Sequence, residues 1–493
     1  MTPAVFPAAP SDLTAALWQA YQQSRGTADA VAHMDYLLTL FWLKCLDQEQ
    51  WSLAAASPKQ PARWLPSLVV PAAAQFATLL AQRLTPQLGA RLDEALAALT
   101  AANPDVLTDV FTHVVFAEPA HVSAAAARDR YLQQQLALVD ALPLPAATQE
   151  SARAPGRAAS ALIARVARPL GKSGSAWCTP PEVADLLARL LAPQAGERLS
   201  DPHCGSGALL AALAEQVDPQ QVSWSGQEPD PAAYGRGRLR LLLYGLPHAQ
   251  LVLGDTLRSP RLLDAQGLQP ADVVATQPPL TTRGWGHELA AQDPYHRFWR
   301  GVPPATQGDF AYISHVLATL PGPAGRAGLL VGHGALYRTG QDGRIRQQLL
   351  EENLLDAVIS LPAQVVPGLN SPLAILLFRR GRTRQDVLFV EASAAPGLAP
   401  ATSVLGDEEL ARLVQAYRTY AAAPPYARCV PLTELRQHQY NLSPARYLPP
   451  SVPEVGGTLR EAQAEILHLE RELLGVQAEL QTCWQALGIA ASD

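Results

Sequence analysis

The sequence of 493 residues lacks the marks of several classes of protein. Its five cysteines are scattered without a Cys-x-x-Cys pair, which argues against a zinc site and a disulfide framework and fits a reducing compartment. No apolar run is long enough to cross a membrane. The first residues lack the charged and apolar segments of a signal peptide. We therefore expect a cytoplasmic protein with no membrane contact and no bound metal.

Lysine is also nearly absent. The chain contains three lysines, Lys44, Lys59 and Lys172. Arginine, which carries almost all of the positive charge, suits contact with phosphate, but GC-rich coding would produce the same bias. The net charge of −6 argues against a molecule whose whole surface binds nucleic acid. If the protein meets DNA, we expect a local patch or a more basic partner to make the contact.

The length predicts two or three domains, and the first of them is expected over residues 1–142. Apolar stripes beginning at Leu13 and at Tyr36 have helical spacing, and alternating strand patterns are missing there. Residues 143–176 are rich in Pro, Ala, Gly and Arg and are interpreted as a basic linker. Such a linker either contacts DNA phosphates or is simply solvated.

Over residues 177–448, short apolar strands alternate with helical segments, which predicts an α/β fold with a doubly wound, mostly parallel sheet. The expected strands are Val222–Trp224, Leu251–Leu253, Asp272–Ala275, Gly328–Val331, Ala357–Ile359, Leu373–Phe378 and Val387–Val390. The last two are so close in sequence that they could pair antiparallel at an edge of the sheet.

The tail, residues 449–493, begins with a Pro/Gly stretch and continues with apolar residues spaced alternately by three and four. This heptad seam is typical of a coiled-coil helix that binds a partner, although a helix lying on its own protein would show the same pattern. The seam consists of Leu459, Ala462, Ile466, Leu469, Leu473, Val476, Leu480, Cys483 and Leu487.

The most informative stretch is Asp201-Pro-His-Cys-Gly-Ser-Gly207, a glycine-rich turn between a strand and a helix. Glycines in such a turn let backbone N–H groups approach a nucleotide-like ligand, although a plain tight turn gives the same match. Glu228 and Asp255 follow at the ends of the next two strands. A carboxylate at Glu228 suits two ribose hydroxyls, and one at Asp255 could accept from the amino group of an adenine.

Two proline motifs flank this turn in the sequence. Thr179 and Pro180 are expected to be the N-cap and first residue of a helix, and Thr179 could also offer its hydroxyl to a ligand carboxylate. Gln277-Pro-Pro-Leu280 follows an apolar strand, where its amide oxygen and a proline carbonyl could both accept from one amino group. The nitrogen lone pair could then attack a sulfonium methyl. The sequence thus predicts a cofactor site beside a base site.

Taken together, these motifs resemble those of the modification subunits of type I restriction–modification systems. These subunits are S-adenosylmethionine-dependent DNA adenine-N6 methyltransferases. The resemblance covers almost the whole chain. Further matching segments are Leu37–Asp47, Leu241–Gly245, Gly254–Leu257, Gly301–Pro304, Gly308–Ala311, Gly325–Ala327, Arg344–Arg346, Leu349–Pro362, Tyr440–Leu442 and Arg446–Tyr447.

The resemblance implies a role for each matching position. The residues implied to bind S-adenosylmethionine are Ala176, Trp177, Cys178, Thr179, Pro180, Pro181, Asp201, Cys204, Gly205, Ser206, Gly207, Ala208, Glu228 and Asp255. The residues implied to hold and stack the flipped adenine are Gln277, Pro278, Pro279 and Leu280. The implied partners are double-stranded DNA and a specificity subunit gripped by the heptad tail, with a second copy of the chain and a restriction–translocase subunit as further members.

One departure from the family pattern bears on catalysis. The family has Asn or Asp before the two prolines and an aromatic residue after them, where this chain has Gln277 and Leu280. The longer side chain moves the amide by roughly 1.5 Å, and a misplacement of about 1 Å can cost on the order of a hundredfold in rate. Loss of the aromatic residue forfeits about 1–3 kcal/mol of stacking.

Three functions therefore stay open. The chain could be an active adenine methyltransferase subunit, a catalytically silent homologue that binds the cofactor and partners as a scaffold, or a methyltransferase for another amine or amide. The specificity-reading subunit is a separate chain in this family, so no DNA target follows from this sequence.

Overall fold

The computed structural model describes residues 12–25, 29–55, 68–118, 125–145, 153–280, 284–392, 405–423, 426–449 and 459–486. The chain forms two compact units, Met1–Pro449 and Pro450–Asp493. The predicted boundaries at 142 and 176 both fall inside the first unit. No helix in the described part of the chain is long and apolar enough to span a membrane.

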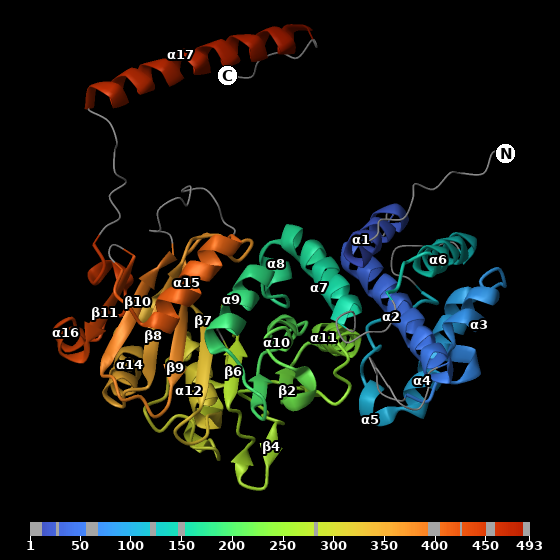
Figure 1. Cartoon of the computed structure of the whole chain (residues 1–493), viewed down its shortest axis with the longest axis horizontal. Coiled ribbons are helices and arrows are strands. Elements are labelled where there is room, and N and C mark those ends of the chain that lie inside the picture. Colours follow the sequence, from blue (N-terminus) through green and yellow to red (C-terminus); the bar gives the residue numbers. More distant parts are fainter. Residues whose placement is uncertain are drawn as a thin grey trace. The chain divides into compact units, whose positions relative to one another are not determined.

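The region before residue 145 is helical, as predicted, and its described residues contain no strand. Asp12 caps the first helix because its carboxylate accepts from the backbone N–H of Thr14. The second helix buries Leu37, Phe41 and Trp42 completely and lies among the other helices of this region (Figure 1). The elements are α1 (Leu13–Ser24), α2 (Ala30–Ala55), η1 (Ala72–Ala74), α3 (Phe76–Ala81), α4 (Leu88–Ala102), α5 (Pro104–Leu107) and α6 (Ala125–Asp140).

The prediction of a linker over 143–176 is wrong for its second half. Helix α7 (Ala154–Ala167) buries Ala158, Leu162 and Ile163 in the same hydrophobic core as the N-terminal helices. Pro155 lies in the first turn of α7, where its missing N–H costs nothing. The short elements η3 (Arg168–Leu170) and α8 (Lys172–Ser175) follow.

A nine-stranded sheet forms the centre of the remaining region, with the order β11-β10-β8-β9-β7-β6-β1-β2-β3. Strands β3, β2, β1, β6 and β7 are mutually parallel, which confirms the predicted sheet. The strands are β1 (Arg198–Asp201), β2 (Ser223–Glu228), β3 (Gln250–Leu253), β6 (Val273–Thr276), β7 (Arg326–Gly332), β8 (Leu355–Leu361), β9 (Leu373–Arg379), β10 (Asp386–Glu391) and β11 (Ala427–Pro431). A separate two-stranded hairpin joins β4 (Leu263–Asp264) to β5 (Gly267–Leu268).

The expected antiparallel pairing of the last two predicted strands is wrong. Strand β9 inserts antiparallel between β7 and β8, and β10 pairs parallel with β8. All seven residues of β9 except Arg379 are buried, so this strand needs a neighbour on each side. The antiparallel edge pair is instead β10 with β11, a strand that the sequence analysis did not predict.

Helices cover both faces of the sheet, so the fold is doubly wound as predicted (Figure 1). The first face packs against α9 (Pro181–Leu191), α10 (Ala208–Ala214), α11 (Pro231–Leu243) and α15 (Asp407–Thr419). The second packs against α12 (Asp309–Thr319), α13 (Gly334–Tyr337), α14 (Gln341–Glu351) and α16 (Leu432–Gln437). Short 3₁₀ turns are η4 (Pro219–Gln221), η5 (His287–Gln292) and η7 (Pro444–Arg446).

The second compact unit contains one helix, α17 (Leu459–Ala486). The described members of the heptad seam, Ile466, Leu469, Leu473, Val476 and Leu480, are all between 45% and 61% exposed. Side chains at the remaining seam positions lie outside the described residues. A helix with an uncovered apolar seam is consistent with a partner, but the partner stays a prediction at this point.

Candidate functional site at the carboxyl edge of the sheet

Four segments predicted to form the site meet at one edge of the sheet. Strands β1, β2, β3 and β6 are parallel, so their carboxyl ends lie together. Strand β1 has β2 on one side and β6 on the other, and the chain therefore winds away from β1 in two directions. Crevices outside the carboxyl ends of strands at such a switch point are where open α/β sheets bind ligands.

The glycine turn after β1 is pressed against the segment that carries the first proline motif. Gly205 has φ of +50°, and a Cβ atom there would lie 2.6 Å from the carbonyl oxygen of Trp177. The N–H of Ser206 donates to that same oxygen at 2.7 Å. Only glycine fits this close approach without strain, which explains the residue type at this position.

Glu228, the last residue of β2, faces the turn. Its two carboxylate oxygens accept from the backbone N–H groups of Gly205 and Asp230, each at 2.9 Å. Burial raises the pKa of Glu228, and the nearby Asp230 and Asp255 carboxylates add to this rise, while the two backbone hydrogen bonds oppose it. Each oxygen retains acceptor capacity, so the carboxylate is oriented by the protein and can still accept from a ligand hydroxyl.

The Asp201 carboxylate makes hydrogen bonds within the protein. Its side chain is buried, and its Oδ1 accepts from the Thr276 hydroxyl at 2.7 Å and from the His203 N–H at 3.1 Å. Burial raises the pKa of this carboxyl to about 7. The bond from Thr276 ties the end of β1 to the end of β6, so that the glycine turn and the base motif are held to a common support.

His203 completes this network. Its Nδ1 lies 3.1 Å from the Thr276 Oγ1, and since that hydroxyl donates to Asp201, the ring nitrogen must be the donor to it. Burial lowers the pKa of His203 to about 3, so the ring is neutral. The ring meets Tyr312 edge-on with centroids 4.6 Å apart. No local pattern in the sequence points to His203, Thr276 or Tyr312, because the side chains that contact one another here come from different segments of the chain.

The first proline motif differs from its expected helix start by one residue. Helix α9 begins at Pro181, and its N-cap is Pro180 with extended backbone and no side-chain cap. The prediction that Thr179 is the N-cap is therefore wrong, because the second proline takes the first helical position, where its fixed φ suits the helix. The Arg236 guanidinium lies 4.8 Å above the ring of Trp177 in the same segment.

The base motif is anchored to this segment through Gln277. Its Nε2 donates to the carbonyl oxygen of Ser175 at 3.1 Å, and its Oε1 is buried with no hydrogen-bond partner among the described residues. An unpaired buried acceptor is costly, and a ligand donor would remove that cost. Pro278 is buried and Pro279 exposed, while Leu280 packs against the core of the sheet.

Asp255 follows β3, and its Oδ1 accepts from the N–H groups of Leu257 and Arg258, each at 2.9 Å. These bonds fix the turn after β3. The neighbouring Thr256 hydroxyl donates to the carbonyl of Pro202, which joins this turn to the glycine turn. All the segments predicted to form the cofactor site are thus in contact with one another through the glycine turn.

A doubly wound sheet with a site of this kind at its carboxyl edge has the methyltransferase fold of the S-adenosylmethionine-dependent type. The profile of the N-6 DNA methylase family matches residues 154–454, and the chain belongs to this family. The match begins at the first residue of α7.

Curated relatives and solved structures agree with this assignment. The chain is 26% identical over 318 residues to the type I restriction enzyme MjaVII methylase subunit of Methanocaldococcus jannaschii, covering 61% of this chain and 54% of the relative. It is 25% identical over 335 residues to the MpnII methylase subunit of Mycoplasma pneumoniae, covering 65% and 62%. The match thus spans between half and two thirds of the length of these relatives.

The fold is also that of solved type I subunits. A methyltransferase subunit of the type I restriction–modification system from Streptococcus thermophilus superposes with a TM-score of 0.77 at 21% identity, over 89% of this chain and 99% of that one. A modification subunit of a type I restriction enzyme from Vibrio vulnificus gives 0.64 at 18% identity, over 88% and 94%. These structural similarities establish the fold of the chain.

Proposed function

We propose that the chain is the modification subunit of a type I restriction–modification system and transfers a methyl group from S-adenosylmethionine to N6 of adenine in DNA. The observation that carries this proposal is Gln277. Its amide nitrogen is held by Ser175, and its amide oxygen is left as a buried, unpaired acceptor beside two prolines that donate nothing. An amino group presented there would give this acceptor the hydrogen-bond partner that the described residues do not supply.

The other half of the site fits a nucleoside cofactor. The backbone of the glycine turn is free of Cβ atoms at Gly205 and Gly207, and Glu228 is held at the end of β2 with acceptor capacity to spare. We propose that these residues, with Asp255 and the segment Ala176–Pro181, hold S-adenosylmethionine. When bound, this cofactor supplies an electrophilic methyl group on a sulfonium.

The chain's own residues would then position the acceptor. Gln277 Oε1 and the Pro278 carbonyl would accept from the two N–H bonds of the adenine amino group, which directs its lone pair away from the ring plane. Leu280 would lie against the extruded base. The Asp201–Thr276 bond, by joining β1 to β6, would keep the two halves of the site in register.

Partners follow from the same proposal. An exposed heptad seam on α17 suits a helix of a specificity subunit, which would read the DNA sequence and explain why an acidic chain acts on DNA. We further propose that double-stranded DNA, a second copy of the chain and a restriction–translocase subunit join the complex. Because DNA is the substrate, the complex would work in the cytoplasm.

A catalytically silent homologue is the second candidate, and Leu280 favours it. A leucine offers a flipped base no aromatic face, and Gln277 reaches its position with one methylene more than asparagine would. Such a protein would bind the cofactor and its partners as a scaffold while transferring methyl groups too slowly to modify DNA.

One pair of measurements tests the proposal. Calorimetry of the full chain with S-adenosylmethionine should show one site per chain. The chain would be co-expressed with its specificity subunit in a host without adenine methylases, and N6-methyladenine in the host DNA would be measured by mass spectrometry. We expect methylation above that of a Gln277→Ala variant. Cofactor binding without any methylation would favour the scaffold, and absence of cofactor binding would overturn the proposal.

A further inference from the structure

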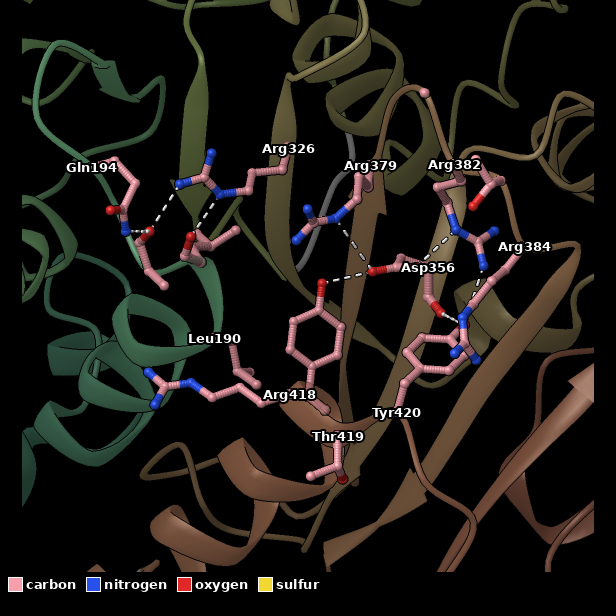
Figure 2. Close-up of a pocket in the computed structure, with 15 residues that line it drawn as sticks. Leu190, Gln194, Arg326, Asp356, Arg379, Arg382, Arg384, Arg418, Thr419 and Tyr420 are labelled. Carbon is pink, nitrogen blue, oxygen red and sulfur yellow. Dashed lines mark hydrogen bonds and ion pairs between the residues drawn. The ribbon is translucent and has the colours of Figure 1, made fainter.

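A pocket lies at the opposite edge of the sheet from the site described above. It has a volume of about 710 Å³ and is formed where the parallel strands β7 and β8 begin and the antiparallel strand β9 ends. The ends of α9 and α15 and the loop between β9 and β10 complete its wall (Figure 2). None of the segments matched to the cofactor or to the base contributes to it.

The lining of this pocket is strongly unbalanced in charge. One carboxylate, that of Asp356, faces five guanidinium groups. The five belong to Arg326, Arg379, Arg382, Arg384 and Arg418. Since nearly every cation of this chain is an arginine, the residue type carries no information here. The informative observation is that all five arginines line the same pocket.

Two of the five arginines belong to the framework. Arg326 donates four hydrogen bonds, to the carbonyls of Leu191 and Ala192 and to both oxygens of the Glu197 carboxylate. Arg382 is buried and donates to the Asp356 carboxylate and to several carbonyls of the strand ends. These two residues are held by the protein and shape the pocket.

The other three arginines keep donors available. Arg379 approaches Asp356 only at 3.6 Å through Nε, and its side chain is 45% exposed. Arg384 is 58% exposed and lies 4.0 Å from the nearest oxygen of Asp386. Arg418 is exposed and has no ion pair or hydrogen bond from its side chain within the described part of the chain. Figure 2 shows these side chains around the same hollow.

Asp356 does not neutralise this charge, because its carboxylate is already engaged. Its Oδ1 accepts from Arg382 at 2.8 Å and its Oδ2 from the Tyr417 hydroxyl at 2.7 Å. The acid therefore balances the buried Arg382, and the positive charge of the three exposed guanidinium groups is left over. Guanidinium groups with free N–H donors recognise phosphate oxygens better than any other side chain does.

The backbone of Tyr420 is a separate sign that this wall is specifically built. Tyr420 is in the left-handed region with φ of +50°, which an aromatic residue rarely adopts. Its hydroxyl donates to the carbonyls of Asp356 and Asp386, and its ring lies 4.7 Å beneath the guanidinium of Arg384. The strained residue thus fixes the direction of one of the three available arginines.

We propose that this pocket is a binding site for the phosphoryl groups of a small ligand of nucleotide size, held by Arg379, Arg384 and Arg418. Its volume lies in the range of about 300–1,000 Å³ that ligand pockets have, which suits a nucleotide and is too small for a DNA duplex. The inference is independent of the function proposed for the carboxyl edge. The phosphoryl chemistry is shared by free pyrophosphate and by a nucleoside polyphosphate, and the experiment distinguishes the two.

The full chain, kept saturated with S-adenosylmethionine so that the site proposed at the carboxyl edge is filled, would be titrated in a calorimeter with pyrophosphate, ATP and adenosine, at low ionic strength and without divalent metal. We expect saturable binding of one ligand per chain for the two phosphorylated probes and none for adenosine. Tighter binding of ATP than of pyrophosphate would assign the pocket to nucleotides, and the reverse to free phosphates. Adenosine binding as tightly as ATP would overturn the proposal.

The variant that tests the residues is Arg384→Gln with Arg418→Gln, and Arg25→Gln with Arg91→Gln is the matched control on exposed arginines of the N-terminal helices. Since one lost charge-assisted hydrogen bond costs about tenfold or more in affinity, the first double variant should bind about a hundredfold more weakly and the control should bind as wild type does. Arg418→Gln alone, at a side chain with no partner among the described residues, should weaken binding about tenfold while the thermal midpoint stays unchanged.

Equal weakening in the control would show that the probes respond only to net charge, and no loss in Arg418→Gln would show that this side chain does not hold them. Either result would sink the proposal. The last probe to be titrated is duplex DNA. If the pocket variant loses affinity for duplex DNA and keeps its affinity for pyrophosphate, the patch is a DNA contact and the small-ligand site does not exist.

Discussion

Asp35 of α2 and Arg236 of α11, 201 residues apart in the sequence, form a two-point ion pair with N–O distances of 2.8 and 2.9 Å. The two side chains are only 5% and 9% exposed. The other face of the Arg236 guanidinium lies over Trp177, whose carbonyl holds the glycine turn. A single buried pair therefore connects the N-terminal helices with the segment proposed to hold the cofactor.

Replacement of Asp35 by alanine should lower the free energy of unfolding by about 3–5 kcal/mol, because it leaves Arg236 buried without its counter-charge. Urea unfolding followed by circular dichroism measures this loss. The informative control is the double variant Asp35→Leu with Arg236→Met, which removes both charges and should recover most of the stability. If the double variant is as unstable as the single one, packing rather than the uncompensated charge causes the loss.

The glycine turn offers a test of close backbone approach. Gly205→Ala would place a Cβ atom 2.6 Å from the Trp177 carbonyl oxygen, in a residue with φ of +50°. We expect a loss of stability of about 1–3 kcal/mol and at least tenfold weaker binding of S-adenosylmethionine in calorimetry. Gly322→Ala is the matched control, since a Cβ there meets nothing within 4 Å. Unchanged cofactor affinity in Gly205→Ala would separate this turn from the cofactor site.

The raised pKa of the buried Asp201 carboxyl predicts that the free energy of unfolding depends on pH. Its folded pKa of about 7 stands above its ordinary value of 3.8 because of burial, so protonation is favoured by folding. The stability that it contributes is complete below about pH 4 and is lost as the pH rises through 7, at about 1.4 kcal/mol for each pH unit in that window.

The Asp201→Asn variant checks this sign. Its Oδ1 can still accept from Thr276 and from the His203 N–H, but it cannot ionise. Urea unfolding of the wild type should therefore show a steeper fall in stability between pH 5 and 7 than unfolding of the variant, and the two slopes should agree above pH 8. Parallel curves over the whole range would mean that Asp201 is ionised in the folded protein throughout.

The base motif predicts a gain of function. Restoring the family pattern with Gln277→Asn and Leu280→Phe should raise the rate of DNA methylation by a hundredfold or more, because an aromatic ring adds about 1–3 kcal/mol of stacking and the shorter amide removes a misplacement. Single-turnover methylation by the complex measures the rate. The two single variants show which change contributes. A wild-type rate equal to that of the double variant would mean that the Ser175 anchor already places Gln277 correctly.

The exposed seam of α17 predicts which residues bind the specificity subunit. Leu469→Asp with Leu473→Asp should abolish co-purification of that subunit, because both positions lie on the heptad seam. Leu467→Asp with Leu474→Asp changes two equally exposed leucines of the same helix that lie off the seam, and it should leave the complex intact. Loss of the complex in both double variants would point to helix unfolding, which circular dichroism of the free chain would reveal.

Much of the molecule follows from local sequence. The alternation of apolar strands with helical segments predicted a doubly wound sheet, because a strand buried on both faces must be apolar throughout. Gly205, Glu228 and Gln277 are recognisable because each lies at the end of a strand or in the turn that follows it, and parallel strands bring their carboxyl ends to one edge. Resemblance to a known family supplied the cofactor and the base.

Only the tertiary structure decided the rest, since long-range partners leave no trace in a local pattern. Residues 154–167 resemble a linker until the N-terminal helices bury one side of them. Strand β9 resembles an edge strand, but it lies inside the sheet because its buried residues need two neighbours. The convergence of Arg379, Arg384 and Arg418 depends on a strand end, a loop and a helix end meeting in space, and the sum of their charges has meaning only there.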